Sequence, residues 1–182
     1  TSVVIGKNAG GAGTNAVAIG EQAGKTTQSD KAIAIGVNAG NDTQGTKAVA
    51  IGDQAGKTDQ SSSAVAVGEQ AGLTTQSQHG IAIGAQAGQT TQGTSSLAIG
   101  KQAGKVNQGN EAVAIGNLAG VNNQAANSIV ISASPTALEN IVEDVFIVKP
   151  VRNGGAGALP TGFHAVAYNP TTGEFAYYGS AG

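Results

Sequence analysis

The sequence predicts an all-β protein: a parallel β-solenoid, or β-roll, of 16-residue coils, followed by a small β-rich unit. Two observations predict this fold. A five-residue segment recurs at a fixed step through the first two thirds of the chain, and the composition changes abruptly after Ser132. A period of 16 residues is too short for helical-hairpin repeats of about 33 to 47 residues and suits one β-solenoid coil. We expect a repeat domain over residues 1–132 and a capping or trimerisation unit over residues 133–182.

Each repeat opens with a short apolar segment that ends in glycine. The first full copy is Ala16-Val17-Ala18-Ile19-Gly20, and the segment returns at 32–36, 48–52, 64–68, 80–84, 96–100 and 112–116. A 14-residue step leads back to residues 2–6, and a last 16-residue step reaches residues 128–132. Four residues after the segment's last position stands a second glycine preceded by alanine, and a glutamine recurs four residues later, at 28, 44, 60, 76, 92, 108 and 124.

Within each segment the apolar residues alternate in size, which is typical of a strand. Val17 and Ile19 point to one face, and Ala16 and Ala18 point to the other. We expect the Val/Ile face to fill a thin interior, with the alanine of the second glycine pair, such as Ala23, opposite it. Strands that stack about 4.8 Å apart would make nine rungs roughly 40 Å long.

The alanine face predicts self-association. A flat strip of small uncharged side chains is unusual on a solvent-facing sheet, so we expect identical chains to bury it against each other. At about 0.8 kcal/mol per methyl-sized group, some fourteen positions supply on the order of 10 kcal/mol per chain before the cost of association. The alternative is that alanine is merely tolerated on an exposed face. The expected trimer interface comprises Ala16, Ala18, Ala32, Ala34, Ala48, Ala50, Ala64, Ala66, Ala82, Ala98, Ala112 and Ala114.

The segment A-V-A-I-G followed by x-x-A-G resembles the head repeats of trimeric autotransporter adhesins, the YadA-like heads. The motif recurs over residues 2–132. The resemblance implies a left-handed parallel β-roll and association of three rolls about a common axis. The chain departs from the usual head in its 16-residue spacing, where about 14 is typical, and this longer coil puts the outer loop in doubt rather than the inner strand.

The C-terminal region contains all the prolines and aromatic residues of the chain. We expect a helical turn capped by Ser134 with Pro135 at its first position, and a strand over residues 145–148. Residues 154–157 read as a glycine-rich loop, and residues 165–178 as a hairpin. This region looks like segments that follow A-I-G repeats in fibre proteins of large DNA viruses and phages, which favours a viral or phage fibre over a bacterial head.

No catalytic, metal or cofactor site is expected. His79 and His164 are not paired with further ligands at metal-binding spacing, although three copies of His164 could meet near a threefold axis. Glu21, Asp53 and Glu69 share one coil position and would form a surface row rather than an acid–base pair. The glycine-rich stretches lack the lysine of a phosphate-binding loop. We therefore expect a protein that is not an enzyme.

Three further features leave alternatives open. The glutamine column is expected to form a ladder of amides that holds the outer loops, with ligand recognition as the alternative. Threonine pairs such as Thr74-Thr75 could order water as ice-binding solenoids do, but the column is interrupted and adjacent residues on a strand face opposite ways. The C-terminal aromatics are expected to pack, while Tyr177 or Tyr178, if exposed, could stack on a sugar of a receptor.

These observations and resemblances together predict a homotrimeric attachment fibre. We expect it to bind a cell-surface receptor, either glycan or protein, from an extracellular position or a virion surface. A bacterial trimeric adhesin head, on the bacterial cell surface, is the first alternative, and an ice-binding β-solenoid is the second.

Overall fold

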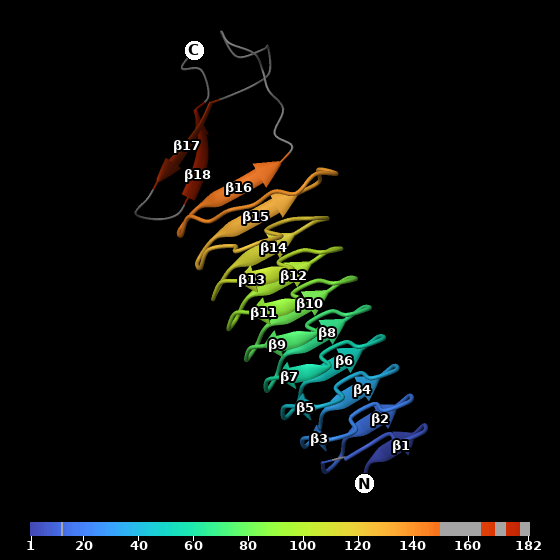
Figure 1. Ribbon diagram of the computed structural model, residues 1–182. Coiled ribbons are helices and arrows are strands. Elements are labelled where there is room, and N and C mark those ends of the chain that lie inside the picture. The colour runs from blue at the N-terminus through green and yellow to red at the C-terminus, as the bar shows by residue number, and fades with distance from the viewer. Residues whose placement is uncertain (12, 150–164, 170–173, 179–182) are drawn as a thin grey trace. The chain divides into compact units, whose positions relative to one another are not determined.

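The computed structural model describes residues 1–11 and 13–149, and the backbone of residues 165–169 and 174–178. The described residues form β-strands and turns, with no helix among them. The chain divides into two compact units, Thr1–Pro150 and Val151–Gly182. The first unit is a stack of similar coils that climb from the N-terminus (Figure 1).

One side of every coil contributes a strand to a ten-stranded parallel sheet. Its strands are β1 (Val3–Ile5), β2 (Val17–Ile19), β4 (Ile33–Ile35), β6 (Val49–Ile51), β8 (Val65–Val67), β10 (Ile81–Ile83), β12 (Leu97–Ile99), β14 (Val113–Ile115), β15 (Ile129–Ser132) and β16 (Phe146–Lys149). Equivalent repeat positions lie in register, as Ala66 does with Ala82. The parallel solenoid and the nine strands expected from the repeat are confirmed, and β16 adds a tenth.

The opposite side of the coils forms a six-stranded parallel sheet. Its strands are β3 (Thr27–Gln28), β5 (Thr43–Gln44), β7 (Thr58–Gln60), β9 (Thr74–Gln76), β11 (Thr90–Gln92) and β13 (Val106–Gln108). Residues with a left-handed backbone conformation bend the chain within each coil. In one coil, Gln70, Thr75 and His79 have φ of 55°, 52° and 59°. The same three coil positions are left-handed through most of the stack, so the bends are a property of the repeat rather than of glycine alone.

The alanines lie inside the coil, which contradicts the expected trimer interface. Ala16, Ala18 and their equivalents are 0–1% exposed within a single chain, so no surface of theirs is left for a second chain. The residues that were expected at the interface and are buried in the coil instead are Ala16, Ala18, Ala32, Ala34, Ala48, Ala50, Ala64, Ala66, Ala82, Ala98, Ala112 and Ala114. The expectation that Val17 and Ile19 fill the interior is also wrong, because both side chains are only partly buried. Ala23, on the opposite wall, is buried as expected.

The interior is narrow because each coil also encloses a glutamine side chain. Gln44, Gln60, Gln76 and Gln92 are at most 1% exposed and are among the largest fully buried side chains. They pack against the glycine of the opposite wall: a Cβ added to Gly72 would lie 2.7 Å from Gln76 Oε1 and 3.3 Å from Ala66 Cβ. An extended amide on one side leaves room only for a methyl group on the other, so the β-branched residues face outward.

The buried glutamines form a continuous ladder along the solenoid. Gln76 Nε2 donates to Gln92 Oε1 at 2.9 Å, to the Val65 carbonyl at 2.8 Å and to the Gly80 carbonyl at 3.1 Å. The amide-to-amide bond repeats from Gln28 to Gln124 with the same direction at every step. The predicted amide ladder is confirmed, but it lies in the core and not in outer loops. Its interior position favours the structural interpretation over ligand recognition.

A glycine column keeps neighbouring coils at strand spacing. Gly68 closes its apolar segment with φ +127°, and a Cβ there would lie 2.8 Å from the carbonyl carbon and oxygen of Gly84 in the next coil. The backbone of one coil therefore occupies the space that a side chain would need. Glycine at this position is required both by the dihedral angle and by the close approach of backbone to backbone.

The solenoid extends beyond the expected boundary at residue 132. β16 pairs with β15 in parallel, Leu138 forms a bridge with Ala119, and the division between the units falls after Pro150. The helical turn expected at Ser134 is wrong: the segment bends there, and the Ser134 hydroxyl accepts a hydrogen bond from the Thr136 amide at 3.3 Å. No helical turn forms because the segment continues the coil, through the bridge at Leu138, to β16.

The second unit contains the predicted hairpin. β17 (Ala165–Asn169) and β18 (Glu174–Tyr178) pair antiparallel, with Tyr168 opposite Phe175. The strand predicted at residues 145–148 also exists, as β16, but belongs to the first unit. The expected glycine-rich loop at residues 154–157 lies outside the described residues.

We predict that Ala66→Leu destabilises the solenoid. The Ala66 side chain is fully buried beside the glutamine ladder, and three extra carbons there force the opposite wall outward at a cost of about 1–3 kcal/mol. Urea unfolding followed by circular dichroism measures the change. Ala85→Leu is the matched control, because residue 85 lies on a coil corner where other coils carry Glu, Asp or Lys. Equal stability of the two variants would contradict the assignment of the alanine face to the core.

Gln76→Leu is expected to lower the free energy of unfolding by about 2 kcal/mol or more. The substitution leaves Gln60 Nε2 without one acceptor and Gln92 Oε1 without its donor, inside the core. Gln78→Leu, two residues along and exposed, provides the control and should change stability little. A Gln76→Leu protein as stable as the control would show that the ladder is not stabilising.

Candidate interaction surface

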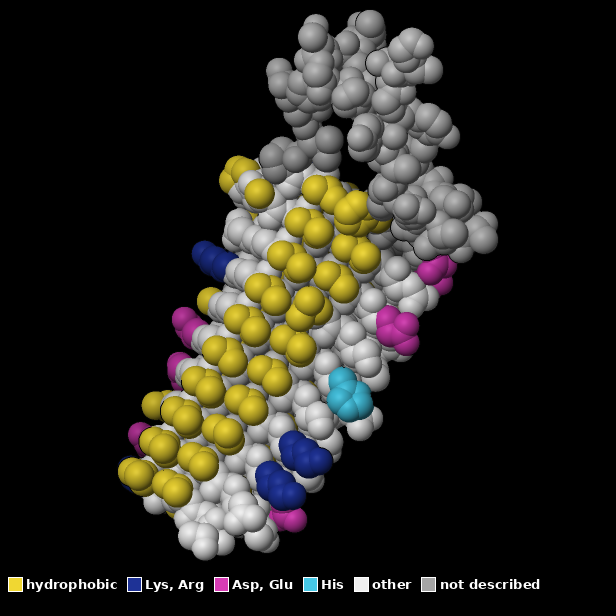
Figure 2. All heavy atoms as spheres, turned by 180° about the vertical axis from the view of Figure 1, so that it is seen from behind, with side chains coloured by type: hydrophobic (Ala, Val, Ile, Leu, Met, Phe, Trp, Pro, Cys, Tyr) yellow, Lys and Arg dark blue, Asp and Glu magenta, His cyan; other side chains and the backbone are white. Residues whose placement is uncertain are grey.

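The outward face of the ten-stranded sheet is a continuous apolar surface. The first and third residue of each strand point outward, and they form two parallel columns along the stack (Figure 2). We call this the apolar face. Its first column is Val3, Val17, Ile33, Val49, Val65, Ile81, Leu97, Val113, Ile129 and Phe146, and its second is Ile5, Ile19, Ile35, Ile51, Val67, Ile83, Ile99, Ile115, Ile131 and Val148.

The apolar face is partly covered by its own stacking and otherwise open. In-register neighbours lie above and below each side chain, so Ile51 and Ile83 are only 37% and 38% exposed. Ten rungs, separated by nine steps of about 4.8 Å, make the face roughly 43 Å long, and one i to i+2 step makes it roughly 7 Å wide between columns. A long apolar strip of this kind marks an interaction surface.

The six-stranded sheet presents polar side chains instead. Thr58, Thr74 and Thr90 occupy equivalent positions, and Thr74 pairs in register with both of the others. The next residue in each strand is exposed but has a left-handed backbone, with φ of 53° at Asp59 and 52° at Thr75. The paired threonines therefore form one column and not the two flat columns that an extended Thr-x-Thr strand would give.

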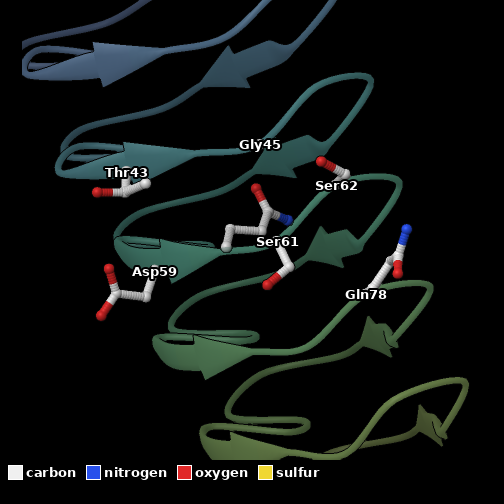
Figure 3. Close-up of a pocket in the computed structure, with 7 residues that line it drawn as sticks. Thr43, Gly45, Asp59, Ser61, Ser62 and Gln78 are labelled. Carbon is white, nitrogen blue, oxygen red and sulfur yellow. The ribbon is translucent and has the colours of Figure 1, made fainter.

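A shallow polar depression lies on the same side of the coils. It has a volume of about 470 Å³ and is lined by Thr43, Gly45, Asp59, Gln60, Ser61, Ser62 and Gln78. Figure 3 shows Asp59 and Gln78 at opposite margins, with Ser61 between them. Gly45 and Ser61, which occupy equivalent positions in neighbouring coils, both line it. Its lining has no aromatic side chain, and the Gln60 amide is already bonded within the ladder.

The titratable residues named by the sequence are dispersed. Glu21, Asp53 and Glu69 are exposed at one coil position, in a surface row that Val37 interrupts between Glu21 and Asp53, and His79 is exposed on a turn. Within the residues that the structure describes, no group of three His, Cys, Asp or Glu side chains is placed to hold a metal ion. In the same residues, no helix long and apolar enough to cross a bilayer occurs.

Three predicted residues belong to the second unit. Tyr177 and Tyr178 lie on β18, opposite Val166 and Ala165, and His164 lies outside the described residues.

The residues of the apolar face are those that sequence reasoning missed as a candidate surface. Both faces of each strand are uncharged, so hydropathy does not separate them. The size restriction does: one face accepts only Ala, Ser or Gly in all the central coils, while the other varies among Val, Ile and Leu. A strict limit on size indicates an enclosed position.

A scan against protein-family models, a search of curated proteins and a search of solved structures each found no match to this chain.

Proposed function

We propose that the chain is a segment of a homotrimeric attachment fibre, without enzymatic activity, in which three solenoids pack through their apolar faces. The observation that carries the proposal is the unbroken double column of Val, Ile and Leu, ending in Phe146 and Val148, along the outside of the ten-stranded sheet. A single chain in water leaves the tips of these side chains exposed over the whole length of the stack.

Three copies about a common axis give each column a partner. A strip only two side chains wide can turn toward the axis, so that the first column of one copy contacts the second column of the next. Burial of about twenty aliphatic tips per chain supplies a driving force that grows with the number of coils. The resemblance to YadA-like heads supports a threefold rather than a twofold arrangement, and the alanines keep each coil thin.

The proposed attachment function relies on a rigid solenoid that presents the same outer side chains in several copies. Three polar outer sheets, related by symmetry, would present the same side chains repeatedly, so weak individual contacts act together at high effective concentration. The resemblance of the C-terminal region to viral and phage fibres favours an origin on a virion surface. A bacterial trimeric adhesin head at the cell surface is the second candidate, supported by the recurrence of the A-[VIL]-A-[IV]-G motif.

Ice binding is a weaker candidate. It requires a flat array of evenly spaced hydroxyl groups, and the left-handed residue at the middle of β7, β9 and β11 interrupts such an array.

We predict that Ile83→Glu weakens the trimer at least about tenfold, because three carboxylates would meet near the axis in an apolar surrounding. Analytical ultracentrifugation of the full chain at several concentrations measures the association. Thr75→Glu adds the same charge to the exposed side of β9 and should leave the trimer intact. A monomeric wild-type chain at micromolar concentration, or equal behaviour of the two variants, would contradict the proposed interface.

Attachment is tested by binding of the labelled full chain to a glycan array and to a panel of intact cells. The trimer is expected to bind at least about a hundredfold more tightly than the Ile83→Glu monomer, because monovalent contacts lose avidity. Absence of binding to every glycan and every cell type would contradict an attachment function.

A further inference from the structure

We propose that charged side chains along the two margins of the apolar face pair between neighbouring copies of the trimer: the copies lie parallel and level with one another, with the entry margin of one copy against the exit margin of the next. This inference rests on the proposed self-association through the apolar face. It adds which residues of neighbouring copies meet.

The entry margin is the column of residues two positions before each strand of the ten-stranded sheet. Its charged members in the N-terminal half are Lys31 and Lys47, which precede β4 and β6, and its charged members toward the other end are Glu111 and Asp144, which precede β14 and β16. All four side chains are exposed. The entry margin is therefore basic in its N-terminal half and acidic beyond it.

The exit margin is the column of residues two positions after each strand, and its charges run the opposite way. Glu21, Asp53 and Glu69 follow β2, β6 and β8, and Lys101 follows β12. These four side chains are exposed too. Lys7, after β1, departs from the pattern and pairs within the chain, where its Nζ lies 4.0 Å from Glu21 Oε1. Figure 2 shows charged side chains on both sides of the apolar columns.

Within one chain, each margin places like charges on adjacent rungs. Lys31 and Lys47 flank neighbouring strands about 4.8 Å apart, and Asp53 and Glu69 do the same on the other margin. Like charges on neighbouring strands destabilise a sheet. Apart from Lys7 with Glu21, the described residues form no ion pair that would offset this repulsion. The margins thus carry charge that an isolated chain leaves uncompensated.

A neighbouring copy at the same height supplies the missing counter-charges. Lys47 and Asp53 flank the same strand, β6, so Lys47 of one copy meets Asp53 of the next on one level. Lys31 and Glu21 are one rung apart, as are Glu111 and Lys101, which long side chains can span. Within one chain Lys47 and Asp53 cannot meet, because six residues of nearly extended backbone separate them by about 20 Å.

The charges alone do not exclude an antiparallel arrangement, in which each margin would lie against its own reversed copy. Centred on the ten strands, that arrangement would also bring Lys31 toward Glu111 and Asp53 toward Lys101. The parallel direction follows instead from the threefold axis of the proposed trimer, and the margin charges specify which residues of neighbouring copies pair on each level.

The test exchanges the two charges on β6. A full-length Lys47→Glu/Asp53→Lys chain keeps an acidic margin opposite a basic one in its own trimer, so it should assemble with itself. Against the wild-type chain, both margins would meet like charge. Co-expression of the two chains with different tags, followed by native mass spectrometry at low salt, should show mixed trimers reduced at least about tenfold from random assortment. The effect should fade at high salt, where exposed charges are screened.

The control exchanges the same charges elsewhere. Lys25→Glu/Asp59→Lys alters exposed residues outside both margins, so this chain should mix freely with the wild type. Random mixing of the β6 exchange variant in trimers that still form would overturn the inference and leave the proposed fibre intact. Preferential mixing of that variant with the wild type would indicate that each margin meets itself, which also overturns it. A wild-type chain that stays monomeric contradicts both proposals.

A cross-linking experiment gives the register directly, because the chain has no cysteine of its own. Lys47→Cys/Asp53→Cys, treated with a short bismaleimide, should yield covalent trimers on a denaturing gel. Lys47→Cys/Lys101→Cys, whose two cysteines lie three rungs apart, should not. Trimers from the second variant and none from the first would contradict the level, parallel register.

Discussion

The buried amide column is the interaction on which the rest of the solenoid depends. Each glutamine from Gln28 to Gln108 bonds two backbone carbonyls within its coil and the amide of the next coil, so it links the two sides of its coil and each coil to its neighbour. A polar group in so thin a core is stable only when its hydrogen bonds are made. The ladder makes them at every step except its first, where Gln28 Oε1 has no partner in the described residues.

The space that this column occupies decides which residues face outward. An extended glutamine, an alanine and a glycine fill the width of the coil, and the larger aliphatic side chains have no place inside. Where the glutamine column ends, the size limit relaxes: Val130 replaces the alanine in β15 and is fully buried, with Leu138 packed against the same core. The larger aliphatic residues therefore face outward because glutamine side chains occupy the core, whereas in most globular domains aliphatic residues are buried and glutamine is exposed.

Periodicity predicted the coil, the register and the ladder, because these depend on spacing along one chain. It did not predict which strand face lies inside. Burial energy alone favours Val17 over Ala18 as a core residue, and only the volume of the closed coil reverses that preference. The boundary at Ser132 was placed too early for a similar reason: β16 lacks the repeat motif, yet its alternation of Phe146 and Val148 continues both columns of the apolar face. The opposite charge trends of the two margins could not be predicted from the sequence, because the margins are defined by where each strand begins and ends.

The central coils are interchangeable modules. Each bonds only to the coil before it and the coil after it, and the ladder, the glycine column and the alanine core all pass through it unchanged. Duplication or loss of one 16-residue unit would therefore lengthen or shorten the first unit by about 4.8 Å while its specialised end coils stay as they are. The length of the first unit can therefore change only in steps of one coil, and recombination between near-identical repeats can produce such steps without a new core.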